Sequence, residues 1–548
     1  MSFPAFRATQ SLANSVRGFS VSRGIIVMVL CPTLLWVVAA AQDSKRTNVE
    51  WPMYNGSYAA DRFSPLQQIT AANVSSLVQV GRYELPETTS FQAGPLVIGD
   101  TMFVTTATST YALDARKGTL RWSQKYSPKT LALNTPVRGA AYDEGRLYRG
   151  TPDAHVLALD ARTGTVIWDV SAGSVDKGEY FTSAPVVWQG RLFIGTSGSD
   201  VGAIRRMMAL DTKDRKLLWN FDVVPSSGPG ADTWPSDLKR NRAGGGIYSG
   251  YALDVASGML YIPTGNPGPD FVAAYRPGAN LFTCSVVRLD AKTGALRGYH
   301  QFTPHDFHDW DVAASPVLLT SRAGKKMVVV GSKDGYLYSL DPELTSVTYK
   351  IPVTTIENVD APITTQGTRF CPGTAGGVNW YGPAYAPSTN TIFVNSVDWC
   401  STIKLGGPES LEFVPGKPFI GSSNAFGDGD AKKIGWLTAV DADSGKVLWK
   451  YQSSLPLVAS ITPTASGLVF TADLDGNLLV FDAQSGKILF RSKVGGPVGG
   501  GVVTYMVEGK QYVAIAAGMK NWILQTESGP ASVVIYALPS PSRSGDGK

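Results

Sequence analysis

The 548-residue chain is poor in charge, histidine and cysteine, and each shortage narrows what the protein can be. Charged residues make up 17% of the sequence, the formal net charge is +5, and the basic residues are scattered. Nucleic-acid-binding proteins gather basic residues on one face, so nucleic acid is not an expected partner. There are four histidines and four cysteines, with no Cys-x-x-Cys-His motif. The chain therefore carries no covalently attached c-type haem, and no metal motif built from Cys and His.

Long apolar runs are also scarce, and the one that is present lies near the N-terminus. Residues 24–41 are almost wholly apolar, follow three arginines and end in three alanines before Gln42. This order predicts a secretory signal peptide over residues 1–41, cleaved after Ala41. The alternative is an uncleaved anchor, because the run is just long enough to span a bilayer.

The few cysteines divide into three kinds. Cys31 lies in the predicted signal peptide, and Cys284 is expected to be a buried thiol. Cys371 and Cys400 remain as a candidate disulfide, because exported proteins fold in an oxidising compartment.

Long helical patterns are missing as well, whereas a short phrase of the form apolar-x-Leu-Asp-Ala-x-x-Gly-x-x-x-Trp recurs. Its alternating apolar residues, Asp-x-x-x-Gly and second apolar run predict two antiparallel strands, with Gly taking the positive φ of the tight turn. The aromatic residue that ends most copies suggests a repeated packing contact. The copies are residues 111–122, 157–168, 208–219, 287–298, 438–449 and 479–490, with a degenerate seventh at 338–341.

The spacing of these copies indicates a repeat architecture. The aspartates of successive copies lie about 40 to 100 residues apart. One four-stranded propeller blade needs roughly 40 to 50 residues, so the longer gaps hold insertions or a weakly marked blade. Seven marked blades and a last strand at residues 533–538 predict an all-β, eight-bladed β-propeller over residues 42–548. Pairing of the two chain ends would close the ring and remove its free edges. Repeats alone also fit a propeller that only binds protein partners.

The densest polar cluster is His-Asp-Phe-His-Asp-Trp-Asp at residues 305–311. It holds three carboxylates, which repel one another unless they share a proton, bind a cation or are fully solvated. From the cluster alone, a solvated acidic loop is as good a reading as a cation site.

The repeats and this cluster together resemble the quinoprotein alcohol dehydrogenases, which bind pyrroloquinoline quinone (PQQ). The resemblance covers about residues 50–538, and its repeat is that family's tryptophan-docking repeat. It is strongest where four motifs occur in the family's order: GGG at 244–246, TGNPGP at 264–269, RPGANLFTCSVVRLDAKTG at 276–294 and FTPHDFHDWD at 302–311.

The resemblance implies PQQ in the central channel, with a metal ion at its quinone edge. Asn266 matches the family's metal-binding Asn, and Asp200 falls where the family has a longer Glu ligand. Asp309 matches the catalytic Asp, the general base on the alcohol hydroxyl and a residue of the metal site. Lys333 matches the basic residue that hydrogen-bonds the quinone oxygens. Further expected PQQ contacts are Gln92, Arg138, Thr182, Ser197 and Asn379.

The sequence also departs from the family. Many members have two adjacent cysteines above the cofactor, but residues 131–134 read Leu-Ala-Leu-Asn. Members have a Trp beneath PQQ after GGG, where Tyr248 is the expected substitute floor. The family's other disulfide does match Cys371 and Cys400. Because both faces of the pocket differ from those of the methanol-oxidising members, the substrate is expected to differ, whereas the cofactor is expected to be the same.

Asp311 bears on the identity of the metal. If residues 309–311 were a strand, Asp309 and Asp311 would point the same way and could face one ion. An acid two residues after the catalytic Asp resembles the branch of the family that uses a lanthanide, since an added negative ligand favours a trivalent ion. The shorter Asp200 and the different wording around His308 keep Ca²⁺ slightly ahead of a lanthanide ion.

The function expected from these observations is a periplasmic PQQ-dependent alcohol dehydrogenase. It would oxidise an alcohol to an aldehyde or ketone and pass electrons to a separate cytochrome c or quinone, with no membrane span after signal cleavage. The alternatives are a PQQ-dependent dehydrogenase for a polyol, a sugar or polyvinyl alcohol, and a non-catalytic propeller scaffold. Matches at Arg138, Asn266, Asp309 and Lys333 argue against the scaffold.

Overall fold

The structure of the protein is a computed structural model that describes residues 48–130, 136–237, 240–424, 428, 432–526 and 529–540. The described residues all belong to the compact unit Thr47–Lys548. The signal peptide expected over residues 1–41 lies outside them and stays a prediction. In the described part, regular secondary structure consists of β-strands and short 3-10 helices, so the expected all-β class is confirmed.

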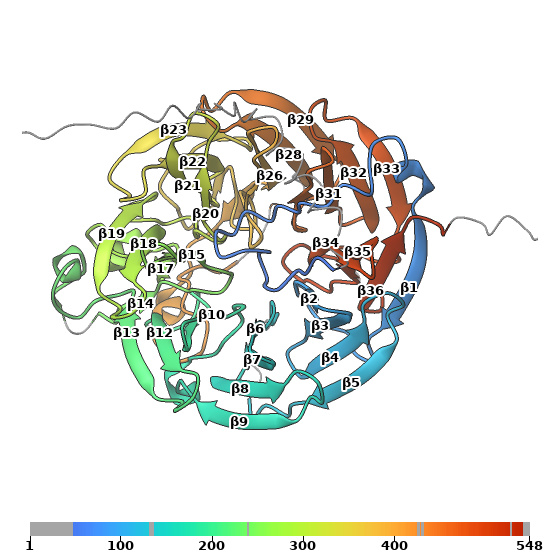
Figure 1. Cartoon of the computed structure of the whole chain (residues 1–548). Helices are drawn as coiled ribbons and strands as arrows, with labels where there is room; N and C mark the ends of the chain where they lie inside the picture. The colour runs from blue at the N-terminus through green and yellow to red at the C-terminus, as the bar shows by residue number, and fades with distance from the viewer. Residues whose placement is uncertain are drawn as a thin grey trace, which may run out of the picture. The chain divides into compact units, whose positions relative to one another are not determined.

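Within the described residues, the strands form eight four-stranded sheets around a common centre (Figure 1). This confirms the eight-bladed propeller. The first four blades are β2 (Leu96–Ile98), β3 (Thr101–Thr105), β4 (Ser109–Asp114), β5 (Leu120–Lys125); β6 (Ala141–Asp143), β7 (Arg146–Gly150), β8 (His155–Asp160), β9 (Val166–Ser171); β10 (Val186–Trp188), β11 (Arg191–Gly195), β12 (Arg206–Asp211), β13 (Leu217–Asp222); and β15 (Ala252–Asp254), β16 (Met259–Pro263), β18 (Ser285–Asp290), β19 (Leu296–Gln301). The last four are β20 (Val317–Thr320), β21 (Lys326–Gly331), β22 (Tyr336–Leu340), β23 (Val347–Pro352); β25 (Ala384–Ala386), β26 (Thr391–Asp398), β28 (Ile434–Asp441), β29 (Val447–Ser453); β30 (Thr462–Pro463), β31 (Leu468–Ala472), β32 (Asn477–Asp482), β33 (Ile488–Lys493); and β34 (Val502–Val507), β35 (Lys510–Ala517), β36 (Ser532–Ala537), β1 (Val78–Glu84).

The eighth blade joins the two ends of the chain. Its outer strand is β1, which pairs antiparallel with β36, with Val78 opposite Ala537 and Glu84 opposite Ser532. The remaining strands of that sheet come from the C-terminal part of the chain. The expected closure is therefore confirmed, and it removes the free sheet edges that an open ring would leave.

Each copy of the repeated phrase forms the two outer strands of a blade, as expected. The final aromatic residue packs onto the turn of the next blade: Trp122 Nε1 donates to the carbonyl oxygen of Ala161 at 3.2 Å, and Trp449 Nε1 to that of Ala483 at 3.0 Å. Gly164 shows why the turn favours glycine, since its φ is 75° and a Cβ there would lie 2.5 Å from the Trp122 ring. The third copy has no glycine, and Arg215 takes the positive φ of 64° instead.

Insertions occupy the long gaps between copies. They contain two short strand pairs, β14 (Ala243–Gly244) with β17 (Pro267–Gly268) and β24 (Thr368–Phe370) with β27 (Ser401–Ile403). The disulfide Cys371–Cys400 fastens the second insertion, as expected, and Cys284 is a buried free thiol. The 3-10 helices are η1 (Val74–Ser76), η2 (Val175–Lys177), η3 (Ala231–Thr233), η4 (Ala273–Tyr275) and η5 (Pro408–Leu411). None of the helices in the described ranges is long and apolar enough to cross a membrane.

Candidate active site

A cavity of about 370 Å³ is lined by residues that range along the chain from Gln92 to Leu524, and both insertions contribute to it. Ten residues predicted from the sequence line it. They are Gln92, Arg138, Thr182, Ser197, Asp200, Tyr248, Asp309, Asp311, Lys333 and Asn379. The eleventh, Asn266, lies directly behind the lining, where its backbone N–H donates to Asp311 Oδ1 at 2.8 Å. Residues that are far apart in the chain thus meet, although their individual roles stay predictions.

One end of the cavity presents hydrogen-bond donors around a buried guanidinium. Arg138 donates to Gln92 Oε1 at 2.7 Å and to Thr182 Oγ1 at 3.0 Å, and Thr182 Oγ1 donates to Ser197 Oγ at 2.9 Å. No carboxylate of the described residues forms an ion pair with Arg138, and its Nε has no partner. Burial lowers the pKa of this arginine. An uncompensated buried cation flanked by hydroxyl and amide groups suits a ligand carboxylate.

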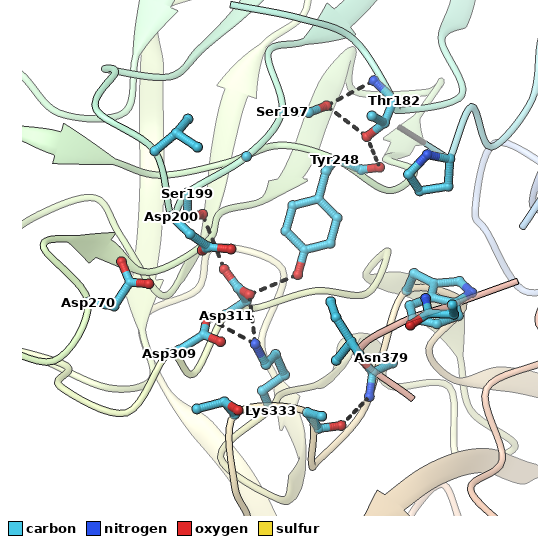
Figure 2. Close-up of a pocket in the computed structure, with 18 of the residues that line it drawn as sticks. Thr182, Ser197, Ser199, Asp200, Tyr248, Asp270, Asp309, Asp311, Lys333 and Asn379 are labelled. Atoms are coloured by element: carbon cyan, nitrogen blue, oxygen red, sulfur yellow. Dashed lines mark hydrogen bonds and ion pairs between the residues drawn. The ribbon is translucent and has the colours of Figure 1, made fainter. Parts of the chain in front are cut away.

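The other end of the cavity is acidic. Lys333 Nζ lies 3.0 Å from Asp309 Oδ1 and 3.0 Å from Asp311 Oδ2. Asp311 also accepts hydrogen bonds from the Tyr248 hydroxyl at 2.9 Å and from Ser199 Oγ at 3.3 Å. Figure 2 shows the Tyr248 ring between the Thr182–Ser197 pair and these carboxylates.

Two further carboxylates, Asp200 and Asp270, line the same end (Figure 2). Asp270 was not singled out from the sequence, and its Oδ1 is buried without a hydrogen-bond partner. Its position directly after the TGNPGP segment that contains Asn266 was the signal that could have found it. Asn266 is itself fully buried, and neither polar atom of its side chain reaches a well-formed hydrogen bond.

The electrostatics of this end are unbalanced. Burial, with the charge of Asp311, raises the pKa of Asp200 to about 6. Burial and neighbouring carboxylates likewise raise the pKa of Asp270 and of Asp309 well above the usual range, although Lys333 opposes the shift at Asp309. Burial would lower the pKa of Lys333, but the charges of Asp309 and Asp311 outweigh it and raise that pKa. Of the four carboxylates, only Asp309 and Asp311 are paired with the Lys333 ammonium, while Arg205 and Arg276 act on Asp200 and Asp270 without forming an ion pair. The pKa values that remain raised indicate a site that favours a cation.

The donor set fits an oxygen-ligated cation rather than one held by protein carboxylates alone. Among the described residues, no three His, Cys, Asp or Glu side chains converge closely enough to form a metal-binding group by themselves. A cation here would need the unpaired amide oxygen of Asn266 and oxygens from a bound ligand as well. Calcium and lanthanide ions accept such mixed oxygen ligands.

The expected strand around Asp309 is wrong, although the two carboxylates do meet at Lys333. Residues 309–311 form no strand, and Asp309 has a φ of 65°. The Asp306 carboxylate accepts the backbone N–H groups of His308 and Trp310, both at 3.1 Å. This clamp on either side of Asp309 stabilises a turn that non-glycine residues rarely adopt. Asp306 therefore stabilises the backbone of this turn.

The expected substitute floor, Tyr248, lies along the cavity. The Arg138 guanidinium lies 5.2 Å from its ring centre, and its hydroxyl reaches Asp311 at the opposite end. Asn379 lines the wall and donates to the carbonyl oxygen of Ala375 at 3.3 Å. Residues 131–134, where many relatives have two cysteines, lie outside the described residues.

An eight-bladed ring with a cavity that is cationic at one end and acidic at the other has the form of a cofactor-binding propeller enzyme. A family profile described as the PQQ-type "Glucose/ethanol/alcohol dehydrogenase, beta-propeller domain" matches residues 51–344. A second profile, "Outer membrane protein assembly factor BamB", matches residues 433–546.

Individual relatives agree with the first profile. The lanthanide-dependent methanol dehydrogenase of Methylacidiphilum fumariolicum is 29% identical over 525 residues, which cover 86% of this chain and 85% of the relative. The quinohemoprotein alcohol dehydrogenase of Comamonas testosteroni is 30% identical over 519 residues, covering 86% and 72%. Among solved structures, a europium-containing methanol dehydrogenase matches with a TM-score of 0.80 and 25% identity, over 91% of this chain and 100% of that one.

The chain belongs to the family of PQQ-dependent alcohol dehydrogenases, and it is a quinoprotein oxidoreductase. The family resemblance expected from the motifs is thereby confirmed. Membership of an enzyme family sets aside the non-catalytic scaffold.

Proposed function

We propose that the protein is a periplasmic PQQ-dependent dehydrogenase that oxidises an alcohol to an aldehyde or ketone. The observation that carries this proposal is the cavity itself, with the Arg138 donors at one end and Asp309, Lys333 and the other carboxylates at the opposite end. The names of the relatives supply the reaction class. A separate cytochrome c or quinone is the proposed electron acceptor, because the chain has no haem-attachment motif of its own.

The cavity suits PQQ, which carries three carboxylates and an ortho-quinone. Arg138, Thr182, Ser197 and Gln92 would bind carboxylate oxygens, with Asn379 and Tyr248 beside the rings. Asp200, Asn266 and Asp309 would supply oxygens to the cation at the quinone edge. When bound, the cofactor supplies the hydride acceptor of the reaction.

Asp309 is the proposed general base. Its carboxylate lines the cavity, and only Lys333 compensates its charge directly. A bound cation would favour the ionised form, so that the carboxylate accepts the proton of the alcohol hydroxyl as hydride leaves the carbon. Lys333 bridges Asp309 and Asp311 by binding both at 3.0 Å, which offsets the repulsion between their charges.

The proposed cation is a lanthanide ion, in place of the Ca²⁺ that the sequence slightly favoured. The reason is the fourth buried carboxylate, Asp270, which adds a negative charge to the cavity. A trivalent ion gains more than a divalent ion from each added carboxylate. The lanthanide-dependent and europium-containing relatives support this choice.

The substrate we propose is an alcohol with an apolar body. Phe271, Ile420, Ile523 and Leu524 line the cavity beside its polar ends, and the indole of Trp522, which also borders the cavity, is 58% exposed. Polyols, sugars and polyvinyl alcohol are the competing substrates. The proposed periplasmic location rests on the predicted signal peptide and suits the disulfide Cys371–Cys400.

Reconstitution of the apo-protein tests the function. The protein is loaded with PQQ and either Ca²⁺ or La³⁺, and alcohol-dependent dye reduction is measured against a panel of primary alcohols, polyols, aldoses and polyvinyl alcohol. We expect quinone absorbance in the loaded protein and the highest kcat/KM with La³⁺ and an apolar alcohol. An absence of both PQQ binding and dye reduction with every substrate would refute the function, and a preference for a polyol or polymer would refute only the substrate.

A further inference from the structure

The two residues on either side of Asp309 stack on each other. The His308 and Trp310 rings are nearly parallel, with centroids 3.9 Å apart and 12° between their planes. Both side chains are buried, and neither is among the residues that line the cavity. The Asp309 carboxylate between them does line the cavity, where Lys333 Nζ lies 3.0 Å away (Figure 2). The stack therefore lies behind the turn that presents Asp309.

The stack rests on the second insertion. The Phe370 ring meets both rings edge-on, with centroids 4.8 Å from the imidazole and 6.1 Å from the indole. The indole N–H donates to the carbonyl oxygen of Pro372 at 3.1 Å. Between these two residues of the insertion stands Cys371, whose disulfide with Cys400 joins the strand pair of β24 and β27. The support beneath the stack is thus fastened covalently.

The stack and a polar clamp together hold the unusual backbone of Asp309. Non-glycine residues seldom take a positive φ such as the 65° of Asp309, and one that does so persists only where its surroundings over-determine it. The polar clamp is the Asp306 carboxylate, which accepts the backbone N–H groups of His308 and Trp310 at 3.1 Å. The ring stack holds the same two residues through their side chains, and stacking of buried aromatic rings is favourable. Loss of either ring would leave the backbone clamp to hold the turn without the stack.

We propose that His308 and Trp310 are positioning residues for Asp309, and that their stack on the second insertion sets where its carboxylate stands in the cavity. Because neither ring lines the cavity, their effect on the reaction acts through Asp309. A shift of about 1 Å in a catalytic group can cost about 10²-fold in rate. The inference rests on the proposed function, because Asp309 is the proposed general base.

Substitutions of the two rings separate positioning from ordinary packing. Trp310→Leu and His308→Leu each remove the stack, whereas Trp310→Phe keeps an aromatic ring. The matched control is Trp219→Leu. Trp219 is 8% exposed, donates through Nε1 to the carbonyl oxygen of Ala291 at 3.2 Å and does not line the cavity. For each variant and the wild type, kcat, KM, PQQ absorbance, Tm and the amide hydrogen exchange of residues 305–311 are measured.

We expect both leucine variants of the stack to exchange faster at residues 305–311 and to lose about 10- to 100-fold in kcat, with KM and PQQ occupancy little changed. Trp310→Phe should recover most of both losses. Trp219→Leu should lower Tm about as much as Trp310→Leu does, yet keep the wild-type kcat and the wild-type exchange at residues 305–311.

Two results would overturn the positioning role. One is a wild-type kcat, or wild-type exchange at residues 305–311, in a folded Trp310→Leu or His308→Leu protein. The other is an equal fall of kcat in Trp219→Leu, because the loss would then follow from stability alone. If the wild type neither binds PQQ nor oxidises any alcohol, the proposed function fails, and amide exchange at residues 305–311 still decides whether the stack holds the Asp309 turn.

Discussion

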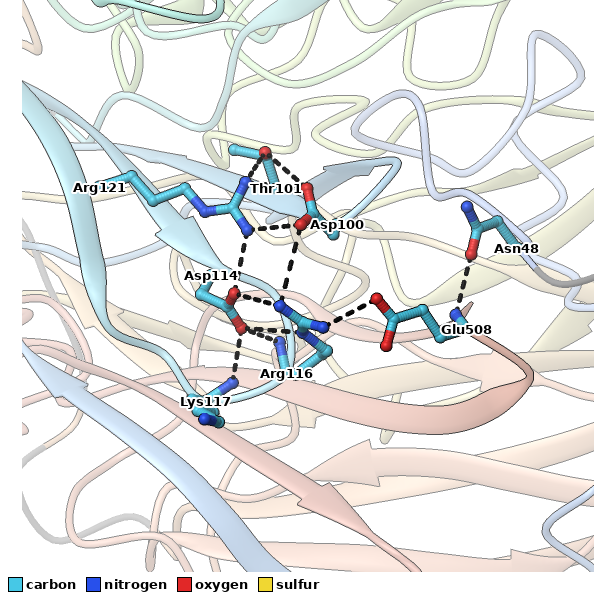
Figure 3. Close-up of polar contacts among 8 residues, drawn as sticks. All are labelled: Asn48, Asp100, Thr101, Asp114, Arg116, Lys117, Arg121 and Glu508. Atoms are coloured by element: carbon cyan, nitrogen blue, oxygen red, sulfur yellow. Dashed lines mark hydrogen bonds and ion pairs between the residues drawn. The ribbon is translucent and has the colours of Figure 1, made fainter.

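The aspartates of this propeller occur in two clusters that differ in how their charges are compensated. In the cavity, Asp309 and Asp311 form ion pairs with Lys333, whereas Asp200 and Asp270 form no ion pair among the described residues. At the rim, Asp100, Asp114 and Glu508 are interleaved with Arg116 and Arg121 (Figure 3). Burial raises the pKa of Asp200 to about 6, whereas at Asp114 the hydrogen bonds from Arg116 and Arg121 outweigh burial and lower the pKa.

The difference shows what each cluster is built for. The rim cluster is complete: Asp114 accepts two guanidinium groups at 2.9–3.0 Å and the backbone N–H of Arg116 at 2.9 Å, and Arg116 reaches Glu508 of the last blade at 2.9 Å. It therefore ties the first blade to the eighth. The cavity cluster is incomplete, because among the described residues only Asp309 and Asp311 form ion pairs there, both with Lys333, whereas Asp200 and Asp270 form none. Structural acids are neutralised by their own protein, and acids that await a ligand are not.

The largest effect is expected when the proposed general base of the cavity cluster is removed. Asp309→Asn should retain PQQ binding and lose about 10²- to 10⁴-fold in kcat, because a neutral amide cannot accept the hydroxyl proton. Steady-state dye reduction gives kcat, and quinone absorbance gives cofactor occupancy. Full activity in a PQQ-loaded variant would show that Asp309 is not the base.

A second change removes the one close cation of the cavity. Lys333→Met should destabilise the cation-free protein by about 3 kcal/mol at pH 8, because it leaves buried carboxylates without a partner. Adding the cation should recover part of that loss in urea unfolding. The matched control is Lys493→Met, whose ion pair with Asp475 at 2.7 Å is 63% and 61% exposed. The free energy of unfolding of that variant should fall by no more than about 1 kcal/mol. An equal fall in both variants would show that the buried and the exposed lysine contribute alike.

A third prediction concerns the pH dependence of stability that Asp334 causes. Burial raises the pKa of Asp334 to about 6 from its ordinary value of 3.8. The folded protein therefore binds more protons than the unfolded chain between these values, and stability falls as pH rises through that window. Asp334→Asn should remove this dependence and gain up to about 3 kcal/mol relative to wild type between pH 4 and pH 7. Parallel pH profiles of Tm would contradict it.

The smallest expected effect concerns the stability contribution of Asp114 in the rim cluster. Asp114→Asn should lower stability by about 1 kcal/mol at pH 7, since it weakens hydrogen bonds to two guanidinium donors whose side chains are 31% and 32% exposed. The lowered pKa of Asp114 means that its contribution is present above the ordinary pKa and is lost as pH falls below it. Urea unfolding at pH 7 and pH 3 should therefore show a smaller difference from wild type at pH 3. A constant difference would mean that the charge of Asp114 is not the cause.

Most of the fold could be predicted from the repeated phrase in the sequence. Asp-x-x-x-Gly turns and their final tryptophans are local signals, so seven hairpins and their docking contacts could be predicted, even where Arg215 replaces the glycine. The closure by β1 and β36 followed from the count of blades. Two insertions were expected only as extra length, because their short strands pair with partners far along the chain and carry no periodic pattern.

The sequence by itself determined the propeller, the disulfide and the candidate residues of the cavity, because each depends on local patterning or on motifs in a recognisable order. Only the tertiary structure decided how the carboxylates are used. It placed Asp270 in the cavity without a donor, surrounded Asp311 with donors, and turned Asp309 toward Lys333 through a left-handed backbone. The physical reason is that the state of a buried charge depends on every group around it, and those groups come from separate blades.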